Sequence, residues 1–176
     1  MFDSYKKFFF IGIGGIGMSA LAKFFLKKGK LIFGYDNNKS EICVSLERLG
    51  AKISYEDSNL DFILDNNIFK HQKNCLIVYT PAINLNNVYL KFFNENNFTV
   101  KKRSEILSKI CENKFLIAIA GTHGKTTTTC IISHILNNSK LDITAFVGGI
   151  SKNLNSNLIG GNGRNEILIV EADEYD

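Results

Sequence analysis

The chain has 176 residues, of which 45% are hydrophobic and 22% charged, and its formal net charge is +4. These proportions are typical of a globular protein with one full hydrophobic core and part of a second. They exclude two classes: only Lys101–Arg103 forms a basic cluster, so no nucleic acid is expected, and no run reaches the ~18 apolar residues of a membrane span, so no membrane partner is expected.

The first segment carries a glycine loop that imitates the start of a signal peptide. Two lysines at 6 and 7 precede an apolar run, and small residues follow at Ala20-Leu21-Ala22. Glycines at 12, 14, 15 and 17 would weaken a signal-peptide helix, and their spacing fits a different pattern. We therefore favour a nucleotide-binding loop, with secretion as the alternative.

That pattern is G-x-G-x-x-G at residues 12–17, between a predicted strand, Phe8–Ile11, and a predicted helix. The helix has an apolar stripe and a terminal glycine: Ile16, Ala20, Leu21, Phe24, Phe25 and Gly29. A second strand, Leu31–Tyr35, ends at Asp36, about twenty residues after the loop. This spacing is typical of a dinucleotide-binding unit, with a diphosphate at the helix N-terminus and a ribose on the acid. Alternatively, the glycines only allow the helix to pack closely on the strand.

Strands and helices continue to alternate as far as residue 83. We predict a helix over Glu41–Leu49, a strand over Ala51–Ser54, an irregular helix within residues 55–74, and a buried strand over Cys75–Tyr79. The turn Thr80–Ile83 follows at the carboxyl end of the last strand. Ligands of open α/β sheets bind at that edge, so we expect this turn to face the nucleotide. Alternatively, its proline only stiffens the loop.

A helix over Val88–Phe93 and a strand over Phe98–Val100 complete the first half. The segment KKRSEIL, residues 101–107, follows. We interpret it either as a segment that faces the ligand or as a solvated charge run with Ser104 capping a helix. Polar residues 111–114 come next, so we place a domain boundary after residue 112.

The second half is organised around FLIAIAGTHGKTTTTCIISHIL at residues 115–136. We predict a buried strand over Phe115–Ala120, a glycine loop over Gly121–Thr126, and a helix with the apolar stripe Ile131, Ile132, Ile135 and Leu136. Glycines let backbone N–H groups surround phosphate oxygens, Lys125 would reach the β- and γ-phosphates, and the Thr126 hydroxyl would bind Mg²⁺. The loop is two residues shorter than usual, because Ile119 replaces the first glycine. Alternatively, the loop merely caps the helix.

The last segment places carboxylates near that loop. We predict a strand over Ile143–Val147, a turn at Gly148-Gly149, an irregular loop over Ser151–Asn165, and an apolar strand that opens the closing EILIVEADEYD. Carboxylates at a strand end beside a phosphate loop are the oxygen ligands that Mg²⁺ needs, although a solvated acidic turn is the alternative. No zinc site is indicated, and His134 is expected to be structural.

Four segments in order, GIGGIGMSALA, KKRSEIL, AGTHGKTTTT and EADEYD, resemble the Mur ligase family, the cytoplasmic enzymes that build the peptidoglycan precursor. Their order is more specific than any one motif. The resemblance implies an α/β fold: a Rossmann-like UDP-sugar-binding domain, residues 1–112, followed by the incomplete start of a P-loop-type ATP-binding domain, residues 113–176.

The resemblance also implies ligands for individual residues. ATP would be bound by Gly121, Thr122, His123, Gly124, Lys125, Thr126 and Thr127. The UDP-sugar would be bound by Gly12, Gly14, Gly15, Ile16, Gly17, Met18, Ser19, Asp36, Thr80, Ala82, Arg103 and Asn157. Mg²⁺ would be bound by Thr126 and Glu171, and Asp173 would lie next to these ligands without binding the metal directly. Thr80 and Pro81 depart from the family's Ser-Ser-Ala-Ile turn, and Ser156-Asn157 is a match of only two residues.

The implied activity is ATP-dependent ligation of L-alanine to UDP-N-acetylmuramate through an acyl phosphate. Lys125, Thr126 and Glu171 would be the catalytic residues, because the transferred phosphoryl group develops charge that Lys125 and Mg²⁺ neutralise. The family has three domains and the sequence stops within the second. We therefore expect a fragment of a longer protein, inactive alone, with a marginally stable second half.

Two other functions stay open. An NAD-dependent oxidoreductase would use the first glycine loop but leaves GTHGKTT unexplained, and a non-catalytic nucleotide-binding module is the second. Within the family, the murein peptide-recycling ligase shares the ATP and acidic motifs, whereas GIGGIGM favours the alanine-adding enzyme. The widely spaced Cys43, Cys75, Cys111 and Cys130 favour free thiols in the reducing cytoplasm.

Overall fold

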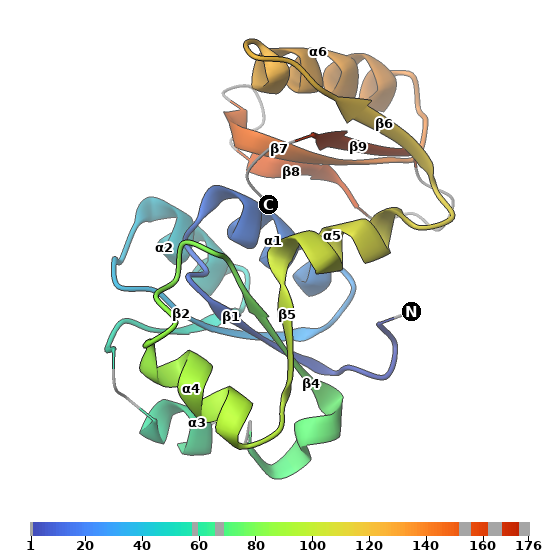
Figure 1. Ribbon diagram of the computed structural model, residues 1–176. Helices are drawn as coiled ribbons and strands as arrows, with labels where there is room; N and C mark the ends of the chain where they lie inside the picture. The colour runs from blue at the N-terminus through green and yellow to red at the C-terminus, as the bar shows by residue number, and fades with distance from the viewer. Residues whose placement is uncertain (1, 58–59, 66–68, 152–155, 162–166, 173–176) are drawn as a thin grey trace.

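The structure, a computed structural model, describes residues 2–57, 60–65, 69–151, 156–161 and 167–172. It has the α/β fold that the sequence predicts, with two sheets stacked one above the other (Figure 1). The first sheet has the strand order β3-β2-β1-β4-β5 and is parallel throughout. The order reverses between β1 and β4, and the crevice at such a point is where open α/β sheets bind ligands.

The elements of the first sheet follow the predicted alternation closely. Its strands are β1 (Lys7–Ile11), β2 (Leu31–Tyr35), β3 (Lys52–Ser54), β4 (Cys75–Tyr79) and β5 (Thr99–Lys102). Its helices are α1 (Ile16–Lys27), α2 (Glu41–Arg48), α3 (Asp61–Asp65), the 3₁₀ helix η1 (Phe69–Asn74), α4 (Val88–Glu95) and α5 (Arg103–Cys111). One detail is wrong: Ser104 does not cap α5. The helix begins at Arg103, and the Lys102 N–H donates to Glu105 Oε1 at 3.0 Å.

The second sheet has the strand order β6-β9-β7-β8, in which only β8 is antiparallel to its neighbour. Its elements are β6 (Phe115–Ile119), α6 (Lys125–Asn138), β7 (Ile143–Ser151), β8 (Ser156–Gly160) and β9 (Ile167–Glu171). Two predictions are wrong here. Gly148-Gly149 is not a turn, because β7 continues through it with a register shift against β8. The predicted loop over Ser151–Asn165 contains β8, whose Asn157 is buried against another element.

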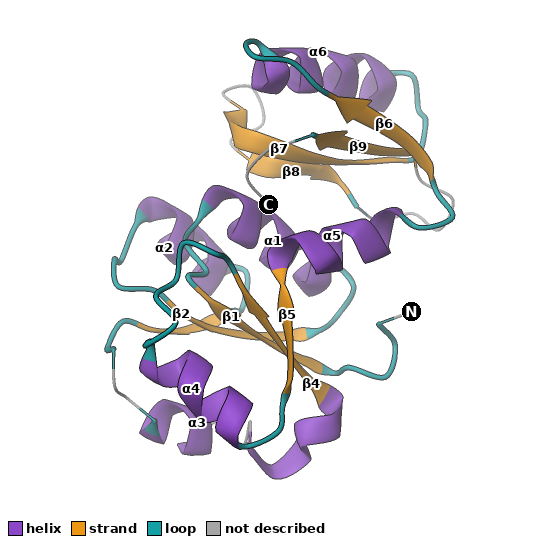
Figure 2. Ribbon diagram, in the orientation of Figure 1, coloured by secondary structure: helices purple, strands orange, loops and turns teal. Residues whose placement is uncertain are grey.

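Helix α1 lies between the two sheets and is buried on both sides (Figure 2). One face packs on the first sheet together with α2 and α5, and the other packs against β7 and β8. Phe24 of α1 meets Phe146 of β7 with ring centroids 5.6 Å apart. One hydrophobic core therefore spans both sheets, with α3 and α4 on the far side of the first sheet and α6 on the far side of the second.

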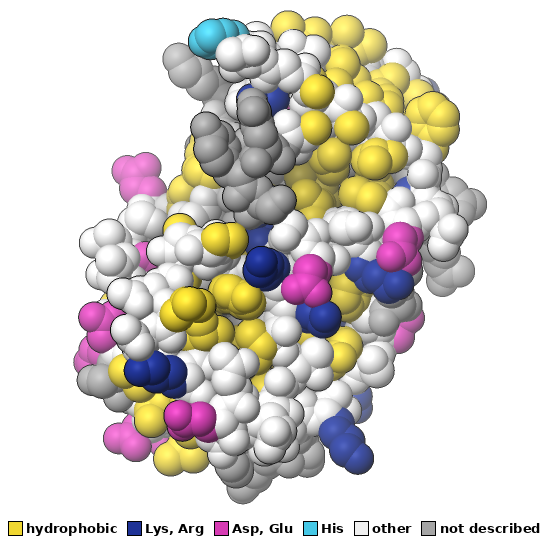
Figure 3. Space-filling view, viewed as in Figure 1, with side chains coloured by type: hydrophobic (Ala, Val, Ile, Leu, Met, Phe, Trp, Pro, Cys, Tyr) yellow, Lys and Arg dark blue, Asp and Glu magenta, His cyan; other side chains and the backbone are white. Residues whose placement is uncertain are grey.

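The second sheet leaves apolar side chains exposed, against the prediction of a buried strand over Phe115–Ala120. β6 is an edge strand, and its Phe115 is 70% exposed. α6 turns Thr129 and Ser133 toward the sheet, whereas Ile131 and Ile135 of the predicted stripe are more than half exposed. Figure 3 shows hydrophobic side chains gathered over this upper part of the molecule. Among the described residues, no helix has the length and apolar character to cross a membrane.

Candidate active site

The first glycine loop leaves β1 and turns back across the end of β2. Gly12 has a φ of +83°, a conformation that favours glycine, and its N–H donates to the Tyr35 carbonyl at 2.8 Å. Gly15 caps α1 without a side-chain hydrogen bond. The first-turn N–H groups of a helix have no intrahelical partners, so this terminus offers donors and partial positive charge to an anion.

The Asp36 carboxylate binds the backbone of this loop. Its Oδ2 accepts the Gly14 N–H at 2.8 Å, and its Oδ1 accepts the Asn38 N–H at 3.1 Å. A Cβ on Gly14 would lie only 2.8 Å from Cys43 Sγ and 2.9 Å from Asp36 Oδ2. Each carboxylate oxygen has a second acceptor position, so the ligand contact predicted for Asp36 stays a prediction.

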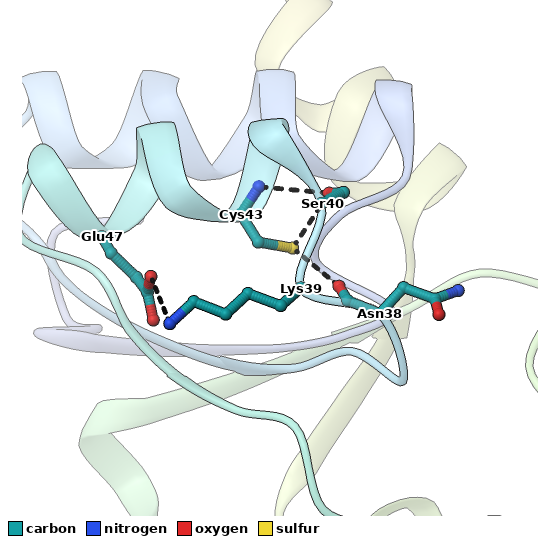
Figure 4. Close-up of polar contacts among 5 residues, drawn as sticks. All are labelled: Asn38, Lys39, Ser40, Cys43 and Glu47. Atoms are coloured by element: carbon teal, nitrogen blue, oxygen red, sulfur yellow. Dashed lines mark hydrogen bonds and ion pairs between the residues drawn. The ribbon is translucent and has the colours of Figure 1, made fainter.

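The N-terminus of α2 also packs against this loop, through Cys43. The Cys43 N–H donates to the Ser40 hydroxyl at 3.3 Å, and the Cys43 thiol donates to the Asn38 carbonyl at 3.5 Å (Figure 4). Burial raises the pKa of the Cys43 thiol. Both observations indicate a structural thiol that packs beneath the loop.

Thr80 and Ala82 follow β4, as predicted, and face the glycine loop across two adjoining cavities. One cavity, of about 590 Å³, includes Gly12, Asp36 and the asparagines 84, 86 and 87 in its lining. The other, of about 420 Å³, lies toward the second sheet. Gly15, Thr80 and Ala82 line both, so the two cavities meet at the crevice between β1 and β4.

Arg103 also lines the smaller cavity, together with Ile16, Gly17 and Met18 of the loop. A Cβ on Gly17 would lie 2.8 Å from Arg103 Nη1, so the guanidinium passes directly over this glycine. The structure therefore brings Arg103 to the start of α1, where the sequence predicts a phosphate or sugar.

Ser19 and Asn157 are placed together but away from both cavities. Asn157 is fully buried; its Nδ2 donates to the Ile16 carbonyl at 2.6 Å and to Ser19 Oγ at 2.8 Å. Its Oδ1 accepts Lys23 Nζ at 2.8 Å. The amide thus ties α1 to β8, and burial lowers the pKa of Lys23. Contact of either residue with the UDP-sugar stays a prediction.

The second glycine loop joins β6 to α6. Gly124 caps α6 with a φ of +76°, and Gly121 also has a positive φ of +147°. Lys125 Nζ donates to the Gly121 carbonyl at 2.8 Å, so the lysine closes over its own loop. The other predicted ATP residues, Thr122, His123 and Thr127, are exposed to solvent.

Thr126 and Glu171 meet at the end of this loop. The Thr126 hydroxyl donates to Glu171 Oε2 at 3.0 Å, and the Gly148 N–H donates to Glu171 Oε1 at 2.7 Å. A hydroxyl beside one carboxylate fits Mg²⁺, which commonly takes one or two carboxylates and completes its shell with phosphate and water. In the part of the chain that the structure describes, three or more His, Cys, Asp or Glu side chains nowhere gather into a metal cluster. Asp173 lies outside the described residues.

The cavity of about 420 Å³ joins the two halves of the site. The first half contributes the loop residues Gly15–Met18, the turn Thr80–Ala82 and Arg103, and the second contributes Phe146–Gly148, Val170 and Glu171. Sequence reasoning missed the β7 residues. The available signal was their place at the carboxyl end of a predicted strand, the edge at which parallel sheets bind ligands.

The cysteines and His134 are the remaining titratable candidates from the sequence. All four cysteines are free thiols, and burial raises the pKa of Cys75 to about 12. His134 pairs with the Asn138 side chain at 3.0 Å on the exposed side of α6, and its structural role stays a prediction.

Residues 7–115 match the family model described as Mur ligase family, catalytic domain. The chain is 45% identical over 171 residues to a UDP-N-acetylmuramate–L-alanine ligase of Christiangramia forsetii, covering 97% of this chain and 37% of the relative. It is 48% identical over 174 residues to the ligase of that name from Flavobacterium johnsoniae, covering 99% and 37%.

Solved structures agree with this assignment. The UDP-N-acetylmuramate–alanine ligase of Thermotoga maritima superposes with a TM-score of 0.80 at 31% identity, covering 96% of this chain and 37% of that one. A murein peptide ligase from Psychrobacter arcticus superposes with a TM-score of 0.81 at 23% identity, covering 97% and 38%, which shows the shared fold. The chain spans about 37% of the length of these curated relatives. The chain belongs to the Mur ligase family.

Proposed function

We propose that this chain forms the UDP-sugar site and part of the ATP site of an enzyme that joins L-alanine to UDP-N-acetylmuramate in peptidoglycan precursor synthesis. The observation that carries the proposal is the cavity of about 420 Å³, whose lining runs from the first glycine loop to Glu171. A ligand that carries both a diphosphate and a carboxylate could place the diphosphate at the first loop and extend the carboxylate through this cavity toward Glu171. The relatives' names supply the identity of that ligand.

In this proposal the first loop holds the diphosphate. The N–H groups at the start of α1 would bind phosphate oxygens, and the Arg103 guanidinium above Gly17 would add a full positive charge. The muramate carboxylate would then extend through the cavity toward Glu171. NAD would leave the second glycine loop and its Thr126–Glu171 contact without a role, which favours a UDP-sugar.

The second loop would hold ATP with its γ-phosphate toward the same cavity. Lys125 would exchange the Gly121 carbonyl for a phosphate oxygen, and Thr126 and Glu171 would hold Mg²⁺. The metal ion would supply positive charge that neutralises the phosphoryl group during transfer. The muramate carboxylate attacks the γ-phosphorus and ADP leaves. The amine of L-alanine then displaces phosphate from the resulting acyl phosphate, so that an amide forms.

The substrates and ATP also determine where the chain would act. We propose a cytoplasmic location, since the substrates and ATP are cytoplasmic metabolites in this pathway. Because the chain spans about 37% of its relatives, we expect ligand binding but no alanine ligation from residues 1–176 alone.

Calorimetry with separate ligands tests the proposal on the purified chain. We expect UDP-N-acetylmuramate and Mg²⁺·ATP to bind independently and NAD to give no heat. Arg103→Ala should weaken UDP-sugar binding about tenfold or more, since a hydrogen bond to a charged group contributes about 1.5–3 kcal/mol. Lys125→Ala should weaken ATP binding by a similar factor and leave UDP-sugar binding unchanged.

Lys101→Ala is the matched control for Arg103→Ala, because the Lys101 ammonium lies in the same segment but pairs with Glu105 at 2.8 Å. Equal losses of UDP-sugar binding in the two variants would indicate nonspecific charge attraction. Binding of NAD in place of UDP-N-acetylmuramate would contradict the proposed function.

A further inference from the structure

We infer that Gly148 is a positioning residue that sets the orientation of the Glu171 carboxylate. Its N–H holds one carboxylate oxygen, and its missing side chain leaves room for the other. The inference rests on the proposed function, because it concerns how the Mg²⁺·ATP site is built.

The two oxygens of Glu171 have partners on different elements. Oε1 accepts the Gly148 N–H of β7 at 2.7 Å, and Oε2 accepts the Thr126 hydroxyl of α6 at 3.0 Å. The carboxylate is therefore fixed at both oxygens between a neighbouring strand and the phosphate-loop helix. Its orientation presents Oε2, and not Oε1, beside the Thr126 hydroxyl.

This arrangement needs glycine at position 148. A Cβ there would lie 2.5 Å from Glu171 Oε2 and 3.0 Å from Glu171 Cδ, both shorter than any ordinary contact. The backbone of Gly148 lies outside the left-handed region, so alanine fits the strand itself. The Glu171 carboxylate is the end of a flexible side chain, so it would move while β7 keeps its path.

The consequence concerns the metal ion. With Oε1 held by Gly148, the Oε2 atom and the Thr126 hydroxyl are, within the described part of the chain, two neighbouring oxygens that could bind Mg²⁺ together. Hydrogen bonds that orient a ligand carboxylate commonly change metal affinity 10- to 100-fold when they are lost. Gly148→Ala should therefore weaken the metal site while leaving the fold intact.

Gly149 provides a matched control in the same strand. A Cβ on Gly149 would meet only the Thr126 methyl carbon, at 3.3 Å, and no atom of Glu171. Gly149→Ala therefore makes the same chemical change one residue away; it shifts the Thr126 methyl by a few tenths of an ångström and does not displace the Glu171 carboxylate.

The experiment measures Mn²⁺, as a paramagnetic substitute for Mg²⁺, by electron paramagnetic resonance on the full 176-residue chain with ATP present. Gly148→Ala should weaken Mn²⁺ binding about tenfold or more. Gly149→Ala should weaken it less than Gly148→Ala does, because the Thr126 methyl shifts slightly while Glu171 keeps both of its partners. Circular dichroism and thermal melting should show both variants folded.

A double-mutant cycle separates positioning from general disturbance. Glu171→Gln should weaken Mn²⁺ binding, and adding Gly148→Ala to it should have little further effect, because both changes act through one carboxylate. If Gly148→Ala fails to fold, Glu171→Asp replaces it, since the shorter side chain cannot reach the Gly148 N–H and Thr126 together. It should also bind Mn²⁺ about tenfold more weakly.

Three results would overturn the inference: unchanged binding in Gly148→Ala, equal losses in the two glycine variants, or additive losses in the cycle. Unchanged binding in Glu171→Asp would do so where that variant is used. Absence of Mn²⁺·ATP binding by the unmodified chain would instead overturn the proposed function itself, and the inference with it.

Discussion

At the scale of single residues, the first glycine loop depends on a carboxylate that is not among the loop's own residues. Asp36 follows β2, yet it binds the Gly14 N–H and so fixes the turn between β1 and α1. A backbone N–H that is bound from below is not available to a ligand above. We therefore expect Asp36 to act on the proposed diphosphate site by fixing the conformation of the loop.

We expect Asp36→Ala to lower the free energy of unfolding by about 1–3 kcal/mol, because the Gly14 N–H then loses its partner in a partly buried position. Urea unfolding measures this loss, and calorimetry should show weaker UDP-N-acetylmuramate binding. Asp57→Ala removes the same charge from the same cavity but from an exposed side chain. Equal effects of the two substitutions would mean that charge, and not the hydrogen bond, is responsible.

At the scale of elements, α1 and β8 are joined by a buried polar contact within an otherwise apolar interface. Lys23 is only 7% exposed, and its ammonium donates to Asn157. Lys27, one turn later, donates to the Gly160 carbonyl at the other end of β8. These contacts fix how α1 lies along the strand, which apolar packing alone determines less sharply.

Burial and, secondarily, the charge of Lys27 lower the pKa of Lys23 from 10.5, which predicts a pH dependence of stability. As pH rises toward 10.5, folded Lys23 releases its proton before unfolded Lys23 does. The unfolded state then binds more protons, so the contribution of Lys23 to stability increases with pH. The thiol of Cys75 acts oppositely, because its raised pKa favours the protonated folded form.

A comparison of the unmodified chain with Lys23→Met separates the pH-dependent contribution of Lys23 to stability from that of the thiols, which both chains share. The unfolding free energy of the unmodified chain minus that of Lys23→Met should rise with pH between the lowered pKa of folded Lys23 and 10.5, and then level off. Urea unfolding at a series of pH values measures it. If this value falls as the pH rises, the lowered pKa assigned to Lys23 is contradicted.

At the scale of the whole molecule, the two sheets differ in how completely they are covered. The first sheet has helices on both faces, whereas the second leaves β6 and the outer side of α6 exposed. Ile131 and Ile135 form part of this exposed surface, at 55% and 56% exposure.

We expect the double substitution Ile131→Gln and Ile135→Gln to cost less than about 1 kcal/mol, because exposed positions contribute little to stability and glutamine suits a helix. Urea unfolding measures this cost. Phe146→Ala is the control in the shared core; its side chain is 7% exposed, and its loss should cost about 3–5 kcal/mol. Similar costs for the two variants would contradict the exposure of α6.

The parts of this structure that the sequence predicts correctly are those with local causes. Gly12 and Gly124 adopt positive φ angles in loops whose spacing alone suggests phosphate binding. Asn157 and Gly148 depend on partners far along the chain, so neither β8 nor the continuation of β7 could be predicted. The same dipeptide Gly148-Gly149 suits a turn or an irregular strand, and only pairing with β8 decides between them. Burial of β6 likewise depends on which neighbours cover it.

The position of α1 between the sheets has a consequence for motion. A hinge at residues 112–114 that swung the halves apart would separate Phe24 from Phe146 and expose apolar surface on both sides of the gap. It would also break the Asn157 contacts with Ile16, Ser19 and Lys23. We therefore expect substrates to enter by rearrangement of the loops at the rim, while α1 serves as a fixed spacer that holds the two glycine loops at a constant separation.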